Sequence, residues 1–174
     1  MEAAAQSCTE RCTALSTFIG NFADVVRIGA PERKDTDLND FLLTLRPFLE
    51  SLASGHGIEL RFTLDENMPA IALDTVQFEQ VVVNLVKNSI ESIGNGGTVE
   101  VVTTSQPPTL TIVDNGAGIS PEAAGKLFSP FFSTKKSGQG IGLTLSAEIL
   151  RAHHFDFSLS TSPSDRLTRF VIKV

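Results

Sequence analysis

Asn84 and Asn88 are the first residues whose type and spacing could do chemistry. They stand in the segment Q-F-E-Q-V-V-V-N-L-V-K-N-S-I-E-S, whose pattern predicts a helix with both amides on one face, one turn apart. Mg²⁺ takes oxygen ligands and keeps several waters, so an amide oxygen together with nucleotide phosphates would form a suitable coordination set. A structural alternative stays open at this point, in which the two amides bond to neighbouring backbone groups.

Asp114 offers a carboxylate at the end of a β-rich run. The run T-L-T-I-V leads directly into D-N-G-A-G, where Gly116 and Gly118 permit a tight turn and a close backbone approach. A carboxylate at a strand end can accept a hydrogen bond from an adenine amino group. The alternative is a solvent-facing turn aspartate that precedes a glycine-rich loop.

Gly138, Gly140 and Gly142 alternate in the segment S-G-Q-G-I-G-L, which runs into a predicted helix. Backbone N–H groups at such a helix start can hold phosphates. The segment differs from the dinucleotide-binding pattern G-x-G-x-x-G in spacing and in having no strand directly before it, and it lacks the Gly-Lys-Ser/Thr ending of a Walker loop. A flexible hinge is the other interpretation.

Aromatic and basic residues lie between these two motifs. Phe128, Phe131 and Phe132 are followed by Lys135 and Lys136 in K-L-F-S-P-F-F-S-T-K-K. A lid anchored by aromatic side chains would exclude water and bring positive charge to the phosphates. The three phenylalanines could instead belong to the core.

The elements that must position these residues alternate along the chain, as in one α+β domain. Helices are expected at 39–54 with Pro47 as a candidate kink, at 75–93 with Asp74 as its cap, at 121–127 and at 141–153. Strands are expected at 58–64, 98–104, 109–113, 155–160 and 167–173, the second and third joined as a hairpin at Pro107-Pro108. This order predicts a sheet with helices on one face, and a loop at 129–140 before the last helix.

An amphipathic helix is expected to precede this domain. Its apolar residues recur in alternating steps of four and three, as a coiled-coil or bundle seam requires; they are Cys8, Cys12, Leu15, Ile19, Phe22 and Val26. The two cysteines at helical spacing are interpreted as small core residues and not as a redox or zinc motif. Gly, Pro and a charge cluster break the pattern over 29–37. We therefore expect a helix within 1–29, a linker at 30–37 and a domain at 38–174.

The composition of the 174 residues, with 41% hydrophobic and 20% charged residues, is that of a soluble protein. A formal net charge of −6 argues against a nucleic-acid partner, because phosphate binding along a duplex needs a basic face. No run approaches the roughly 20 apolar residues of a membrane span, and M-E-A-A-A-Q lacks the features of a signal peptide. A cytoplasmic location is expected.

The order and spacing of the four motifs are more specific than any one of them. N-x-x-x-N at Asn84, D-x-G-x-G at Asp114, F-x-P-F-F at Phe128 and G-x-G-x-G-L at Gly138 resemble the N, G1, F and G2 boxes of two-component sensor histidine kinases. The resemblance covers about residues 36–174. The helix at 5–29 looks like the second helix of the family's dimerisation and phosphoacceptor domain, and L-F-S-P-F-F-S-T-K looks most like the nitrogen-regulatory type.

The resemblance implies the fold shared by gyrase, heat-shock chaperone, histidine kinase and mismatch-repair ATPases: a two-layer α/β sandwich whose mixed, mainly antiparallel sheet is covered by helices on one face. It implies ATP and Mg²⁺ as cofactors, and transfer of the γ-phosphate to a histidine outside this chain for relay to a response regulator. Asn88 is then the expected Mg²⁺ ligand with Asn84 assisting, Asp114 reads the adenine amino group, Thr168 contacts adenine or a water, and Lys135 approaches the phosphates.

The nucleotide-binding residues implied in this way form a larger set. They are Asn84, Lys87, Asn88, Asp114, Gly116, Gly118, Ile119, Phe132, Thr134, Lys135, Gly138, Gly140, Ile141, Gly142, Leu143 and Thr168. Asn84, Asn88 and Lys135 are the expected catalytic residues among them.

The histidines depart from the family pattern. His56, His153 and His154 are the only ones, and none stands in the motif of a phosphoacceptor, so we interpret all three as structural or surface residues. The sequence is therefore expected to be part of a longer protein that begins further upstream in its dimerisation domain. The expected partners are that domain, a second copy of the protein and the receiver domain of a response regulator.

Two other functions stay open. An ATP-hydrolysing machine of the gyrase or chaperone kind uses a glutamate where this chain has Asn84, and an amide cannot take a proton from water. A nucleotide-binding regulatory module, or an anti-sigma serine kinase, would share the boxes. The apolar seam from Cys8 to Val26 favours the sensor kinase, because anti-sigma kinases lack such a helix.

Overall fold

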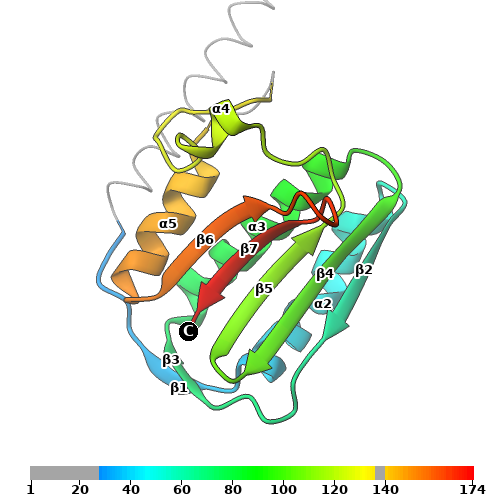
Figure 1. Ribbon diagram of the computed structural model, residues 1–174. Coiled ribbons are helices and arrows are strands. Elements are labelled where there is room, and N and C mark those ends of the chain that lie inside the picture. Colours follow the sequence, from blue (N-terminus) through cyan, green and yellow to red (C-terminus); the bar gives the residue numbers. More distant parts are fainter. Residues whose placement is uncertain (1–27, 136–139) are drawn as a thin grey trace, which may run out of the picture.

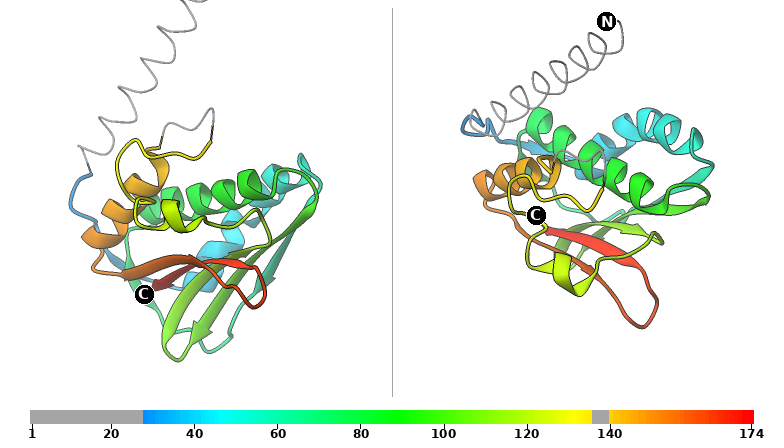
Figure 2. Two further views of the ribbon diagram at one scale, coloured as in Figure 1. Left: turned by 45° about the horizontal axis from the view of Figure 1, so that its top comes forward. Right: turned by 90° about the horizontal axis from the view of Figure 1, so that it is seen from above.

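The computed structural model describes residues 28–135 and 140–174, and these form two layers, a sheet and a set of helices packed on one of its faces (Figures 1 and 2). The strands are β1 Lys34–Thr36, β2 Ile58–Thr63, β3 Ile71–Leu73, β4 Gly97–Ser105, β5 Pro108–Asp114, β6 Asp156–Thr161 and β7 Thr168–Lys173. The helices are α2 Leu38–Ser54, α3 Thr75–Ile93, α4 Pro121–Ala124 and α5 Gly142–Ala152. The expected α+β sandwich is confirmed.

The main sheet is mixed and mainly antiparallel. Its order is β2-β4-β5-β7-β6, with β2 parallel to β4 and every other neighbouring pair antiparallel (Figure 1). The hairpin between β4 and β5 pairs Val101 with Ile112 and ends at the prolines, as the sequence predicts.

A second, two-stranded sheet pairs β1 with β3, Lys34 opposite Leu73. The sequence predicts no strand in either segment, because three residues are too few to display an alternating pattern. Residues 34–36 fall within the linker predicted at 30–37, and residues 1–27 of the predicted helix before it lie outside the described residues. The boundary at 30–37 and the amphipathic helix before it therefore stay predictions.

Helix α3 has the bounds that the sequence predicts. Asp74 caps it, accepting hydrogen bonds from the N–H groups of Val76 and Gln77 at 3.0 and 3.1 Å. Apolar residues at helical spacing bury one side of the helix against the sheet: Phe78, Val81, Val82, Leu85, Val86 and Ile90. The remaining polar stripe, which contains Asn84 and Asn88, is left to face the site.

The alternation along β5 decides where its last residue points. Leu110, Ile112 and Asp114 are all buried and lie two residues apart, so they share the face of the sheet that the helices cover. Asp114 is therefore carried under α3 and does not face solvent. The alternative of an exposed turn aspartate is excluded by this placement.

The end of α4 differs most from the predicted helix bounds. The short helix predicted at 121–127 ends after Ala124, because Gly125 follows and the chain continues in turns. Pro47 lies inside α2, which runs through it from Leu38 to Ser54.

Within the described ranges, no helix combines the length and the apolar character that crossing a bilayer requires.

His153 ties the end of α5 to the start of α3. Its ring is buried, Nδ1 lies 2.8 Å from the Ile149 carbonyl oxygen, and Nε2 accepts the Asp74 N–H at 3.0 Å. The rings of Phe78 and Phe155 pack around it, with centroids at 6.4 and 5.5 Å. His153 therefore has the structural role that the sequence analysis assigned, while His56 and His154 are exposed.

We expect His153→Ala to lower the free energy of unfolding by about 2–4 kcal/mol, since it removes a packed ring and leaves the Asp74 N–H without its acceptor. Urea unfolding at neutral pH measures this. The matched control is His154→Asn, because His154 is exposed with φ 63° and asparagine tolerates that conformation. Its expected change is within about 0.5 kcal/mol, and equal stability of the two variants would contradict the assigned role.

Candidate functional site

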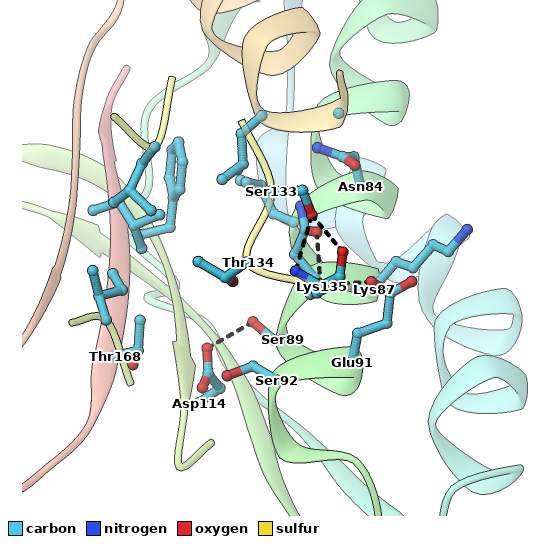
Figure 3. A pocket seen from close by; sticks show the side chains of 18 of the residues that line it. Asn84, Lys87, Ser89, Glu91, Ser92, Asp114, Ser133, Thr134, Lys135 and Thr168 are labelled. Atoms are coloured by element: carbon cyan, nitrogen blue, oxygen red, sulfur yellow. Dashed lines mark hydrogen bonds and ion pairs between the residues drawn. The ribbon is translucent and has the colours of Figure 1, made fainter. Parts of the chain in front are cut away.

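The sequence motifs meet in one cavity of about 640 Å³, between α3, the ends of β5 and β7, and the segment before α5 (Figure 3). Its volume is in the range that small-molecule and cofactor sites occupy. Fourteen of the sixteen implied residues line it: Asn84, Lys87, Asn88, Asp114, Gly118, Ile119, Phe132, Thr134, Lys135, Gly140, Ile141, Gly142, Leu143 and Thr168. Gly116 lies outside the lining, and Gly138 lies outside the described residues.

Asp114 sits at one end of the cavity and is 5% exposed. Its Oδ2 accepts a hydrogen bond from the Ser89 hydroxyl at 2.9 Å, and its Oδ1 accepts one from the Gly116 N–H at 2.9 Å. Burial raises the pKa of this carboxyl, and the two hydrogen bonds oppose that shift. The result is an oriented acceptor that is largely shielded from solvent.

Gly116 acts on the site from outside the cavity, through the packing of the chain. A Cβ at this position would collide with the Ser92 side chain and come 2.9 Å from Asp114 Oδ1. The absence of a side chain lets the loop after β5 lie directly against α3, where the Ala117 N–H donates to the Ser92 carbonyl at 3.2 Å. The carboxylate position therefore depends on this glycine.

The Thr168 hydroxyl lines the neighbouring wall, and Thr161 supports it from outside the lining. The Oγ1 atoms of Thr161 and Thr168 are 3.0 Å apart, and Thr161 Oγ1 accepts the Ile119 N–H at 2.9 Å. Thr168 is opposite Asp114 in the β5–β7 register. Gly118, at φ 78°, lies against Thr161 and lets the chain turn there. Carboxylate and hydroxyls together form a polar recognition surface at this end.

Asn84 and Asn88 form the other end of the cavity. The Asn84 amide donates to Ser146 Oγ of α5 at 2.8 Å, and a Cβ on Gly142 would collide with Asn84 Oδ1, so α5 begins in close contact with α3. Asn88 Oδ1 accepts a hydrogen bond from Lys135 Nζ at 3.3 Å. Its Nδ2 is buried and finds no acceptor among the described residues, which marks a group available to a ligand.

The start of α5 has no side-chain cap. Ile141 occupies the N-cap position, and its side chain has no acceptor for the N–H groups of the first turn of α5. The carbonyl oxygen of Gly140, which has φ 66°, accepts the Phe131 N–H at 2.9 Å, and this bond holds residues 128–135, here called the lid segment, to the start of α5. The first turn of α5 therefore presents backbone donors to the cavity beside the two asparagines.

The three phenylalanines of the lid segment have different roles. Phe128 packs edge-on against Phe157 and Phe170, at centroid distances of 5.2 and 6.1 Å, so for this residue the core interpretation is correct. Phe132 lines the cavity, and Phe131 is 47% exposed.

The two lysines of the site differ in direction. The ammonium of Lys135, which lines the cavity, lies against α3, 2.5 Å from Glu91 Oε2. The exposed Lys87 extends away from Asp114 (Figure 3). Beside Asn88, positive charge thus comes from the lid segment.

Several residues that line the cavity are not identified by the sequence analysis above. Ser89, Glu91 and Ser92 all come from α3, and Ser133 from the lid segment. Glu91 and Ser92 follow Asn88 at helical spacing and continue the stripe begun by Asn84, so extending the periodicity by one turn could have found them.

The comparisons with known proteins agree with this geometry. A family model described as histidine kinase-, DNA gyrase B- and HSP90-like ATPase matches residues 73–174. The C4-dicarboxylate transport sensor protein DctS of Rhodobacter capsulatus is 31% identical over 141 residues, which are 78% of this chain and 22% of that protein. The chain thus spans less than a quarter of this relative.

Solved structures share the fold. Full-length ShkA in complex with AMPPNP matches with a TM-score of 0.76 at 17% identity, over 96% of this chain and 37% of that one. Histidine kinase ThkA in complex with response regulator protein TrrA matches with a TM-score of 0.75 at 22% identity, over 95% and 49%. Since the family model covers more than half of the chain and the motif residues line one cavity, this protein belongs to the histidine kinase-, DNA gyrase B- and HSP90-like ATPase family.

Proposed function

We propose that this chain is the ATP-binding catalytic domain of a sensor histidine kinase, which transfers the γ-phosphoryl group of ATP to a histidine outside the chain. One observation carries the proposal. A single cavity has a buried, oriented carboxylate at one end and, at the other, two amides beside an uncapped helix start. Such an arrangement suits a ligand that has a base with an amino group at one end and phosphates at the other.

The adenine end is Asp114 with its neighbours. The carboxylate accepts a hydrogen bond from the amino group of adenine. It discriminates against a base that has a carbonyl oxygen at that position, because two acceptors would then face each other. Thr168 contacts the base directly or through a water, as it lines the cavity and its hydroxyl is held by that of Thr161. Gly118 and Ile119 shape the pocket around the base.

The phosphate end is formed by α3 and α5. Asn84, the N–H groups from Gly140 to Gly142 and the Lys135 ammonium provide the donors. The same end includes Phe132, Thr134, Ile141 and Leu143, with Lys87 and Gly138 as further proposed contacts.

Asn88 fits the role of a Mg²⁺ ligand. Its Oδ1 already faces a cation, the Lys135 ammonium, and its unpaired Nδ2 leaves the amide free to adjust. Within the described ranges no group of three His, Cys, Asp or Glu side chains is placed to hold a metal. This donor set suits Mg²⁺ held by one protein oxygen together with phosphates and waters. Bound there, the ion would neutralise charge on the phosphoryl group being transferred.

The residues of this chain position the reaction more than they perform proton chemistry. Asn84 is an amide whose Nδ2 is engaged by Ser146, and it cannot act as the base for an attacking water. This supports transfer to a histidine over hydrolysis. The proposed partners are a dimerisation and phosphoacceptor domain, to which the helix at 5–29 would belong, a second copy of the protein, and a response regulator. The nitrogen-regulatory type stays a prediction from the lid residues.

Phosphotransfer in trans tests the function. The chain is incubated with labelled ATP and Mg²⁺, alone and with a separately produced dimerisation domain that carries a phosphoacceptor histidine. We expect acid-labile phosphate on the added domain only, because His153 is buried with both ring nitrogens engaged and the exposed His56 and His154 lie outside the cavity lining. Label on the chain itself, abolished by changing one of its histidines, would contradict the proposal.

We expect Asp114→Asn to weaken ADP binding by about 1–3 kcal/mol and to reduce the preference for adenine over guanine nucleotides, because an amide can present a donor where an acceptor is needed. Calorimetric titration measures both. The control is Asp65→Asn, which removes the same charge outside the cavity. A variant with unchanged ATP-over-GTP preference would refute the assigned role of Asp114.

The pH dependence provides a second readout of the same residue. Since burial raises the pKa of Asp114, its protonation should weaken ADP binding at a pH above the ordinary aspartate range. The effect on folding has the opposite sign: a raised pKa favours the protonated folded state, so this contribution to stability is present at low pH and is lost as the pH rises through the folded-state pKa. In Asp114→Asn both dependences should disappear.

We expect Asn88→Ala to remove most of the Mg²⁺ dependence of ADP binding, since the side-chain oxygen would no longer hold the ion. Affinities are compared in excess Mg²⁺ and in EDTA. Asn95→Ala, an exposed loop change outside the cavity, is the control. If Asn88→Ala keeps the full difference between the two conditions, the metal site lies elsewhere.

A further inference from the structure

Glu91 brings a carboxylate to the phosphate end of the cavity, one turn of α3 after Asn88. Its Oε2 is 2.5 Å from Lys135 Nζ, and the same ammonium is 3.3 Å from Asn88 Oδ1 (Figure 3). An acidic and an amide oxygen of one helix therefore share a cation that comes from the lid segment. None of the four sequence motifs includes Glu91.

We propose that Glu91 is a positioning residue for Lys135, holding its ammonium on the oxygen of Asn88, and that this contact and Mg²⁺–nucleotide binding exclude one another. The second half of the proposal rests on the proposed function, in which Asn88 is the metal ligand. The first half concerns only side chains of this protein and can be tested without nucleotide.

Mutual exclusion follows from distance and charge. Mg²⁺ binds oxygen ligands at about 2.0–2.1 Å and holds a near-octahedral shell. An ammonium 3.3 Å from the same Oδ1 would then stand within a few ångströms of a divalent ion and inside its water shell. Because like charges at that separation repel strongly in a partly buried site, the lysine has to leave the Asn88 oxygen when the ion arrives.

The backbone around Lys135 permits this movement. The Lys135 N–H donates to Ser133 Oγ at 3.1 Å, and that hydroxyl lies 3.4 Å from the Lys135 carbonyl oxygen. This serine turn fixes the main chain, so rotation about the four-carbon stem is sufficient to take the ammonium from α3 toward the phosphates.

The ion pair has the strength of a reversible contact. The side chains of Lys135 and Glu91 are 35% and 39% exposed, and pairs of this exposure change an equilibrium by roughly two- to fivefold. The contact between Glu91 and Lys135 has to open before the lysine can leave the Asn88 oxygen. Glu91 should therefore oppose the binding of Mg²⁺ and nucleotide through its hold on the lysine.

Chemical reactivity of Lys135 tests the positioning role. The protein without nucleotide is treated with an amine-acetylating reagent, and modification of each lysine is followed by mass spectrometry. We expect Glu91→Gln to raise the rate at Lys135 roughly two- to fivefold and to leave Lys173, an exposed lysine on β7, unchanged. Glu79→Gln, at an exposed glutamate of the same helix, should change neither rate. An unchanged rate at Lys135 in Glu91→Gln would overturn the proposal.

ADP binding in excess Mg²⁺ tests the exclusion. Glu91→Gln should bind ADP roughly two- to fivefold more tightly than the unmodified protein, and this gain should vanish in a Lys135→Met background. An equal gain with and without Lys135 would mean that Glu91 repels phosphates directly, which overturns its action through the lysine. Failure of the unmodified protein to bind ADP in Mg²⁺ would refute the proposed function, while the reactivity result would still decide the Glu91–Lys135 contact.

Discussion

The burial of the Asp114 carboxylate between the end of β5 and helix α3 is the constraint on which the site depends. A carboxylate removed from water needs partners, and here the Ser89 hydroxyl and the Gly116 N–H supply them. Both partners act only if α3 lies directly against the loop after β5, which the missing side chain of Gly116 allows. Satisfying one buried charge therefore fixes the height and the rotation of α3 over the sheet.

The rotation of α3 then decides what else can face the cavity. With Phe78, Val82 and Leu85 turned into the core and Ser89 turned to Asp114, the stripe of Asn84, Asn88 and Glu91 is left at the cavity wall. Asn84 reaches Ser146, and the absence of a side chain on Gly142 lets α5 begin beside it. One helix thus connects an acceptor for a base with a helix start whose donors carry no side-chain cap, and this connection makes a single elongated ligand the natural occupant.

Lys135 and Glu91 neutralise one another in the structure as it stands. The Lys135 ammonium lies between the Glu91 carboxylate and the Asn88 amide oxygen, and the pair is exposed enough to open without a large free-energy cost. A ligand with phosphates and a cation would offer each of these groups a different partner. The protein therefore has two self-consistent sets of charge contacts at one place, and the choice between them is set by the ligand and not by refolding of the chain.

The sequence by itself determined the features that depend on local pattern. The cap at Asp74 and the apolar spacing set the bounds of α3, and the β-rich run predicted a strand that leads into Asp114. The family resemblance carried by the four ordered motifs named sixteen residues, of which fourteen line one cavity. Only the tertiary structure decided which side chains meet. Ser89 and Asp114 are 25 residues apart and Glu91 and Lys135 are 44 apart, and β1 pairs with β3 across the whole of α2 and β2. Periodicity reports which face of an element is buried, but it contains no information on the partner across the gap, because that depends on how closely two elements approach.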